Sequence, residues 1–198
     1  MARGTGGIMA LTKIPEEMID ASAGSADEVL TTDGADATWA AAASGGLTGA
    51  DTWRVNTGFS SPAEPVTANW EQDDTDAAGR IGSGMAQADG VFTFPDTGYW
   101  LVSFRYISYG TARISYNSAV IGVTINDGGA WGEAAVAYQG HDYSASGNIY
   151  ASADVQKLVD VSDTANIKVR FSVGGTEAVG ADTNANVTFA IFLRLGDT

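Results

Sequence analysis

Apolar and polar residues alternate with a period of two in several segments that follow residue 53. The alternation is clearest in NIKVRFSV, residues 166–173, and in NVTFAIFLRL, residues 186–195. This period predicts antiparallel strands that turn one face to a core and the other to solvent. The expected core positions are Ile167, Val169, Phe171 and Val173 in the first segment and Val187, Phe189, Ile191, Leu193 and Leu195 in the second.

Other segments predict further strands and the turns between them. Residues 99–109, YWLVSFRYISY, carry apolar side chains on both faces, which is typical of a central strand or of a strand at a subunit contact. Residues 120–136 contain NDGG, and Asn, Asp and Gly accept the positive φ of a hairpin turn. No helical period follows residue 50, and about eight to ten short strands should form an antiparallel sandwich or barrel. The further strand candidates are 53–57, 66–72, 90–94 and 149–160.

The first 50 residues have a different composition. Between residues 14 and 49 the chain is rich in Ala, Gly, Ser, Asp and Thr, and only IPEEMID suggests a turn or two of helix. Such a segment cannot bury enough apolar surface to fold alone, so it needs a partner. SGGLTG, residues 44–49, indicates a flexible joint. We therefore expect an N-terminal anchoring arm and linker over residues 1–50 and a β-sandwich domain over residues 51–198.

Composition supports an all-β domain and argues against several partners. Gly contributes 25 residues, and charged residues make up only 17% of the chain. The net charge of −14 repels phosphate backbones, so nucleic acid is not an expected partner. The absence of Cys excludes disulfides, thiolate nucleophiles and Cys-based metal centres. Because no long uncharged apolar stretch and no convincing secretory signal occur, a membrane is not an expected partner either.

Two polar segments offer candidate chemistry. His141 precedes Asp142 in QGHDYSASGN, but no G-x-S-x-G nucleophile elbow accompanies this pair, so we expect an ordinary surface histidine. In EQDDTDAAGR, residues 71–80, Asp74 and Asp76 alternate as in a calcium loop, but no third ligand follows and Gly79 is out of position. A solvated loop is the expectation there, and a calcium site is the alternative. We expect no enzymatic activity, no cofactor and no metal centre.

The segment VFTFPDTGYWLVSFRY, residues 91–106, resembles a motif of C1q/TNF-like jelly rolls, in which a strand ends in F-x-x-P-x-x-G-x-Y. The hairpin at NDGG, the segment VQKLVDVSDTANIKVRF and the final NVTFAIFLRL are also similar to that family. The family's Gly in the last strand is replaced here by Ala190 and Ile191. The resemblance covers residues 53–198 and implies an antiparallel jelly-roll sandwich. The residues that carry the first motif are Phe92, Phe94, Pro95, Gly98 and Tyr99.

The same resemblance implies a homotrimer, because jelly rolls of this family pack around a threefold axis through aromatic-rich faces. The strand at 99–109, with apolar residues on both faces, would suit such a contact. The expected trimer contacts are Trp100, Phe104, Tyr106 and Tyr109. The alternative is that these side chains fill the core of a single chain.

The N-terminal segment KIPEEMIDASAGSADEVLTTDGADATWA resembles a segment common in bacteriophage fibre and appendage proteins, G-x-a-x-x-V-L-t-t-D-G-x-x-x-t-W. In those proteins it lies just before a distal, often trimeric, domain. The resemblance implies an attachment arm whose small apolar patches bind a partner or one another around an axis. Its expected contact residues are Ile14, Met18, Val29, Leu30 and Trp39.

Together these patterns indicate a bacteriophage virion structural protein on the virion surface, assembled in the host cytoplasm. It would be a head fibre, a capsid decoration protein or a short tail appendage. The expected partners are the chain itself, other virion proteins of capsid or tail, and a host surface glycan or protein. Loops at 110–119, 139–148 and 174–186 suit recognition, and an exposed tyrosine cluster would favour adhesion over decoration. The alternative is a carbohydrate-binding lectin or a glycan-active jelly-roll protein.

Overall fold

The computed structural model describes residues 28–32, 37–41 and 46–198. The chain divides into two compact units, Met1–Gly46 and Leu47–Thr198, and the second is called the β domain below. Its first strand is β3 (Gly49–Val55), so the last residues that the sequence assigned to the linker belong to the β domain.

The first unit contains one antiparallel pair, β1 (Glu28–Thr32) and β2 (Ala37–Ala41). Leu30 lies opposite Trp39 in this pair, which brings together two of the residues expected to contact a partner. The turn expected at Asp33-Gly34 lies outside the described residues, as do Ile14 and Met18.

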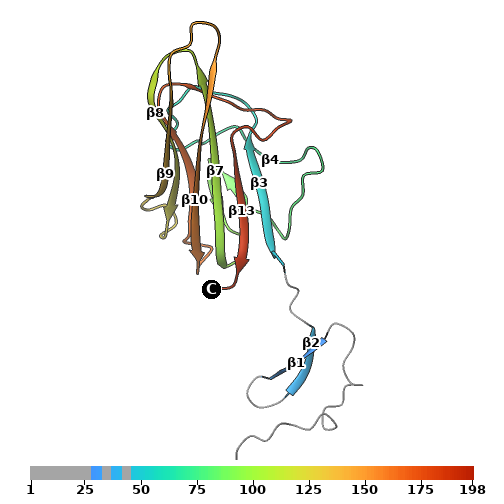
Figure 1. Cartoon of the computed structure of the whole chain (residues 1–198). Coiled ribbons are helices and arrows are strands. Elements are labelled where there is room, and N and C mark those ends of the chain that lie inside the picture. Colours follow the sequence, from blue (N-terminus) through green and yellow to red (C-terminus); the bar gives the residue numbers. More distant parts are fainter. Residues whose placement is uncertain (1–27, 33–36, 42–45) are drawn as a thin grey trace, which may run out of the picture. The chain divides into compact units, whose positions relative to one another are not determined.

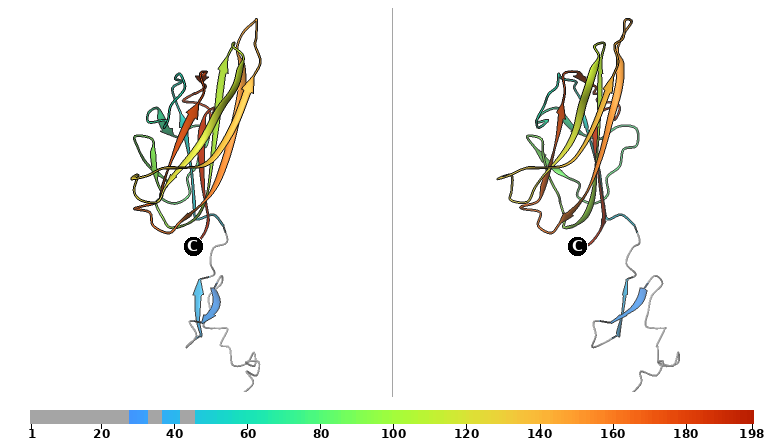
Figure 2. Two further views of the ribbon diagram at one scale, coloured as in Figure 1. Left: turned by 90° about the vertical axis from the view of Figure 1, so that its left-hand side faces the viewer. Right: turned by 60° about the vertical axis from the view of Figure 1, so that its left-hand side comes forward.

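The β domain is a sandwich of two antiparallel sheets that face each other (Figures 1 and 2). In spatial order, the six-stranded sheet contains β10 (Ile149–Val161), β7 (Gly98–Gly110), β13 (Phe189–Gly196), β3 and β4 (Trp70–Gln72), and β12 (Ala178–Val179) also pairs with β7. The five-stranded sheet contains β5 (Ala86–Ala88), β6 (Val91–Thr93), β11 (Lys168–Gly174), β8 (Ile114–Thr124) and β9 (Gly132–His141). The expectation of an all-β antiparallel sandwich is confirmed. Among the described residues, no helix could span a membrane.

Aromatic side chains from both sheets meet in the core. Phe104 of β7 and Phe171 of β11 lie with ring centroids 4.8 Å apart, and Phe92 of β6 and Phe192 of β13 lie 5.3 Å apart. Each such side chain removes a large apolar area from water, and the pairing adds about 0.5–1.5 kcal/mol. Strand β7 therefore runs through the centre of the domain, as its apolar pattern predicts.

In β13, the residues that the sequence predicted to face the core face outward, and the alternate residues face the core. Ala190 and Phe192 are fully buried, whereas Phe189, Ile191 and Leu193 are half-buried on the outer surface of the sheet. Both faces of β13 are apolar, and period two alone cannot say which face is inside. By contrast, the expected inward set of β11 is confirmed, because Val169, Phe171 and Val173 are all buried.

The chain enters the β domain at one end, and two turns project from the other end. At one end, the start of β3 lies beside the end of β13, where Gly49 pairs with Arg194, and the start of β7 is next to it. At the other end, Gly110 pairs with Ile149, and the turns 111–113 and 142–148 project beyond the sheets (Figure 1). The chain therefore enters the domain at the end opposite these two turns.

In two hairpin turns, the residues with positive φ are Asp and Gly. The hairpin predicted at NDGG joins β8 to β9, with φ of 56° at Asp127 and 87° at Gly128. A second tight turn joins β5 to β6, with φ of 49° at Asp89 and 78° at Gly90. Two central residues with positive φ are what a type I′ hairpin requires.

Replacement of Gly90 by alanine is expected to destabilise the β domain by about 2 kcal/mol or more, because left-handed backbone costs roughly 1–2 kcal/mol for a residue with a side chain. The added Cβ would also lie 2.1 Å from the carbonyl oxygen of Val66, so the turn must shift. Urea unfolding followed by tryptophan fluorescence measures the loss. Gly79→Ala is the control, because nothing lies within 4 Å of a Cβ there; equal losses in the two variants would refute the steric argument.

Candidate interaction surfaces

The acidic segment 71–76 binds an arginine of the protein itself. Arg54 of β3 is fully buried and donates hydrogen bonds from Nη1 to Asp73 at 2.7 Å, from Nη2 to Asp74 at 2.6 Å and from Nε to Glu71 at 3.3 Å. Burial alone would lower the pKa of this guanidinium, but the hydrogen bond to Glu71 and the three negative charges outweigh it and raise the pKa above its ordinary value. The segment is therefore an ion cluster that holds the loop on the sheet.

Asp74, one of the two expected calcium ligands, is engaged by Arg54, whereas Asp76, the other, is exposed. Glu71, Asp73 and Asp74 tie the start of the segment to Arg54, and residues 76–80 are exposed, as expected for a solvated loop. Within the part of the chain that the structure describes, no group of three or more His, Cys, Asp and Glu side chains is arranged to hold a metal ion.

His141 lies at the end of β9 and is half-buried. Its Nδ1 lies 3.1 Å from the backbone carbonyl of Asp142, and no serine hydroxyl or carboxylate among the described residues is hydrogen-bonded to the ring. The arrangement lacks the nucleophile–base–carboxylate geometry of a hydrolase.

Three of the four expected trimer contacts lie inside the core of a single chain. Trp100, Phe104 and Tyr106 are at most 1% exposed, so the expectation that they contact another copy is wrong. They occupy alternate positions of β7 that face the other sheet. Burial raises the pKa of the Tyr106 phenol, which keeps it neutral in the core. Tyr109 is the exception: it is half-buried on the outer surface, where its ring lies 5.5 Å from that of Tyr150.

The outer surface of the six-stranded sheet carries several apolar side chains near the end where the chain enters, beside Asp160 of β10, which lies opposite Tyr99. Leu101 of β7 lies opposite Leu158 of β10 on one side and Leu193 of β13 on the other, so three leucines form a row across the sheet. Leu158 and Leu195 are each 53% exposed. Side chains of this kind on a soluble protein mark a surface for association when they are contiguous. We call this surface the apolar sheet face; it consists of Tyr99, Leu101, Leu158, Ile191, Leu193 and Leu195.

Tyrosines are exposed on strands β8, β9 and β10 and in the turn 142–148. Tyr116 and Tyr138 pack edge to face at 5.9 Å and are 61% and 67% exposed, respectively. Tyr143 and Tyr150 are each 67% exposed. Tyrosine offers a large, rigid contact area with a polar tip, which suits recognition of another molecule.

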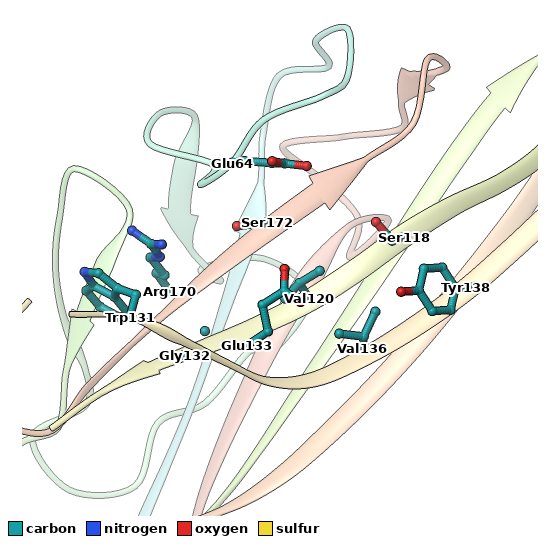
Figure 3. Close-up of a pocket in the computed structure, with 11 residues that line it drawn as sticks. Glu64, Ser118, Val120, Trp131, Gly132, Glu133, Val136, Tyr138, Arg170 and Ser172 are labelled. Carbon is teal, nitrogen blue, oxygen red and sulfur yellow. The ribbon is translucent and has the colours of Figure 1, made fainter.

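A groove of about 210 Å³ lies on the outer surface of the five-stranded sheet (Figure 3). Its floor is formed by Val120 and Gly122 of β8, and Trp131 and Arg170 lie at one end. Ser118 and Tyr138 lie at the other end. The hollow exists because Gly122 and, on β9, Gly132 carry no side chain at positions that line it.

The charged groups of this groove are Arg170, Glu64 and Glu133. The guanidinium of Arg170 lies over the indole ring of Trp131, 4.4 Å from its centroid. This cation–π contact holds the guanidinium at the groove and leaves its N–H groups free to donate. Sequence reasoning missed this groove, because its residues come from β8, β9, β11 and the loop at residue 64, and only pairing of the strands brings them together.

No protein-family model matches the sequence, and no curated protein matches it. Solved structures do match the fold. The Eiger TNF of S. frugiperda has a TM-score of 0.59 at 14% sequence identity, over 75% of this chain and 93% of that one. Murine APRIL at pH 5.0 has a TM-score of 0.56 at 13% identity, over 74% of this chain and 98% of that one.

The fold is a TNF-like jelly roll. At these identities the likeness concerns the fold alone, and it confirms the C1q/TNF-like sandwich that the motif at residues 91–106 implied. Fold does not determine function, which must be argued from the surfaces described above.

Proposed function

We propose that the protein is a homotrimeric structural protein of a bacteriophage virion, anchored by its N-terminal arm and projecting the TNF-like domain outward to attach to the host surface. The observation that carries the proposal is the apolar sheet face, which leaves two leucines more than half exposed on a strongly acidic chain. Burial against two other copies would remove this surface from water. The resemblance of the sequence to C1q/TNF-like proteins supports threefold packing.

The particle-bound role rests on the N-terminal segment. Its similarity to the segment that precedes distal domains in phage fibres and appendages supports an attachment arm, with Val29, Leu30 and Trp39 as its contacts. The antiparallel pairing of β1 with β2 supports a small preformed hairpin as the binding element. Three weak arm contacts in one trimer would act together, so modest affinity of each arm is enough for stable attachment.

Host attachment is favoured over simple decoration by where the tyrosines lie. The turn that carries Tyr143 projects at the end of the β domain opposite the entry of the chain at Leu47 (Figure 1). A β domain held where the chain enters it, at Leu47, would therefore present this turn at its opposite end. This role is one of binding, with no chemical step, and it places the protein on the virion surface after assembly in the host cytoplasm.

Light scattering of the purified full-length protein and of a variant without residues 1–46 tests the proposal. A single full-length chain has a mass of 20.4 kDa. We expect each of the two proteins to have three times the mass of its own single chain, because the apolar sheet face belongs to the β domain. If the shortened protein is a monomer, the apolar sheet face does not carry the association. If both are monomers, the homotrimer proposal fails.

A further inference from the structure

The groove of Figure 3 presents hydrogen-bond donors and acceptors that have no polar partner among the described residues. On β11, Lys168 forms an ion pair with Asp127, whereas Arg170, at the next outward position, forms none. The carboxylates of Glu64 and Glu133 are also without an ion pair or hydrogen bond in the described part of the chain. Three charged groups thus line one groove without neutralising one another.

The two carboxylates lie on opposite sides of the floor. Ala63 pairs with Val173 along the edge of β11 that faces away from β8. Glu64 therefore lies on the side of β11 that is remote from β8 and β9. Glu133 belongs to β9, where it pairs with Gly122 across the other edge of the floor. Arg170 lies beside Trp131 at one end of the floor, where a Cβ on Gly122 would lie 3.2 Å from its Cγ. A ligand in the groove would therefore meet acceptors on both flanks and a donor at its end.

This combination of groups selects a ligand with many hydroxyls. A carboxylate only accepts hydrogen bonds and a guanidinium only donates them, whereas a hydroxyl does both. Neighbouring hydroxyls of a sugar ring could donate to Glu64 and Glu133 and accept from Arg170, and charge-assisted bonds of this kind are strong. Val120 and Val136 offer an apolar surface for the C–H groups of the ring. An anionic polymer is disfavoured by the net charge of −14 and by the two carboxylates of the groove.

We propose that this groove binds a neutral saccharide. The proposal deepens the host attachment proposed above and rests on it, because it names the chemical class of the host ligand. The groove lies on the outer surface of the five-stranded sheet and the apolar sheet face on that of the six-stranded sheet, so trimer formation leaves the groove open. The exposed pair Tyr138–Tyr116 extends the groove beyond Ser118 and provides an aromatic surface on which a second sugar unit could pack.

Binding of the full-length protein to an array of neutral oligosaccharides built from glucose, galactose, mannose, rhamnose or N-acetylglucosamine tests the proposal. Heparin and polygalacturonate serve as acidic probes. Calorimetry with the neutral sugar that binds best then compares the wild type with Arg170→Gln and Glu133→Gln. Each variant is expected to bind at least about tenfold more weakly, since each loses a charge-assisted hydrogen bond. Arg80→Gln is the matched control, because Arg80 is an exposed arginine outside both the groove and the turn 142–148.

Each alternative outcome has a definite meaning. Binding to no neutral sugar, binding to the acidic polymers alone, or affinity unchanged in both groove variants would overturn the proposal. Loss of binding in Tyr143→Ala with full binding in Arg170→Gln would move the site to the turn 142–148 and overturn the groove. Glu133 is exposed, so its isosteric replacement leaves folding intact and keeps the test decisive. Light scattering of the same samples separates the proposals: a trimer that binds no sugar refutes only the groove, and a monomer that binds sugar refutes only the trimer.

Discussion

Replacement of Ile191 by aspartate is expected to convert the proposed trimer into monomers at micromolar concentration. Ile191 lies half-buried on the outer surface of β13, next to Leu193 at the margin of the apolar sheet face, opposite Ser103 of β7 and Thr52 of β3. Full burial of such a side chain contributes about 1.5–3 kcal/mol, and because Ile191 is already half-buried in the single chain, association adds about half of that per copy. A trimer buries three copies, so the loss of about 3 kcal/mol lowers the association constant by roughly two orders of magnitude, before the cost of burying three carboxylates is counted. Sedimentation velocity over a concentration series measures the change.

The matched control for this prediction is Ile125→Asp. Ile125 is 76% exposed, more than any residue of the apolar sheet face, but it lies in the turn between β8 and β9. If exposure of apolar surface in general drove association, both isoleucines would matter equally. We expect the Ile125 variant to remain a trimer. Leu158→Asp, at a 53% exposed position of β10, provides a second test with less risk to folding. A trimer that survives both Ile191→Asp and Leu158→Asp would contradict the proposed interface.

The same strand shows why the sequence predicted the fold better than the interface. Period two in residues 186–195 correctly predicts a strand, but the register decides which set of side chains is inside. Here Phe192 and Ala190 fill the core, and the larger set that includes Ile191 and Leu193 faces outward. This strand has large apolar side chains on both faces, so period two does not reveal which face is inside, and the proposed contact with another copy would bury the outer one. For the same reason, the aromatic residues of β7 were assigned to the trimer and belong to the core.

Chain topology also explains why the groove could not be found in the sequence. Glu64, Glu133 and Arg170 are separated by long stretches of chain, and each is an ordinary charged residue in its local context. The local patterns that succeeded, such as NDGG between β8 and β9, depend on neighbours in sequence. A site assembled across three strands and a loop depends on the register of every pair between them.

The sequence did not predict the ion cluster in the acidic segment 71–76, because the arginine that binds these acids is distant in sequence. Four acids within six residues suggest a solvated loop or a cation site. The cation is in fact a guanidinium, supplied by Arg54 from the adjacent strand β3, which lies opposite Glu71 of β4. Nothing in the spacing of the acids distinguishes a calcium ion from a buried arginine.

Replacement of Arg54 by methionine is expected to destabilise the β domain by about 3 kcal/mol, because it removes one partner of a buried ion cluster and leaves the others uncompensated. Methionine fills much of the volume of the side-chain stem but offers no donor to Glu71, Asp73 or Asp74. These carboxylates would then repel one another across the edge of the six-stranded sheet. Asp74 is 70% exposed, so solvent offsets part of this repulsion, and the expected cost lies at the lower end of the range for buried pairs. Guanidinium chloride unfolding of the full-length protein measures it.

Comparison with Arg105→Met shows how much of the stability loss in Arg54→Met is due to the burial of the arginine. Arg105 also forms an ion pair across two strands, with Asp154 at 2.6 Å, but the two side chains are 46% and 52% exposed. Exposed pairs of this kind contribute at most about 1 kcal/mol, so this variant should be nearly as stable as the wild type. Arg54→Lys should fall between the two, since it keeps the charge but loses the planar fork that reaches three carboxylates at once. If Arg54→Met costs no more than Arg105→Met, the cluster does not hold the loop 73–75 on the sheet. If Arg54→Lys is as stable as the wild type, charge alone, and not the geometry of the guanidinium, stabilises this edge of the jelly roll.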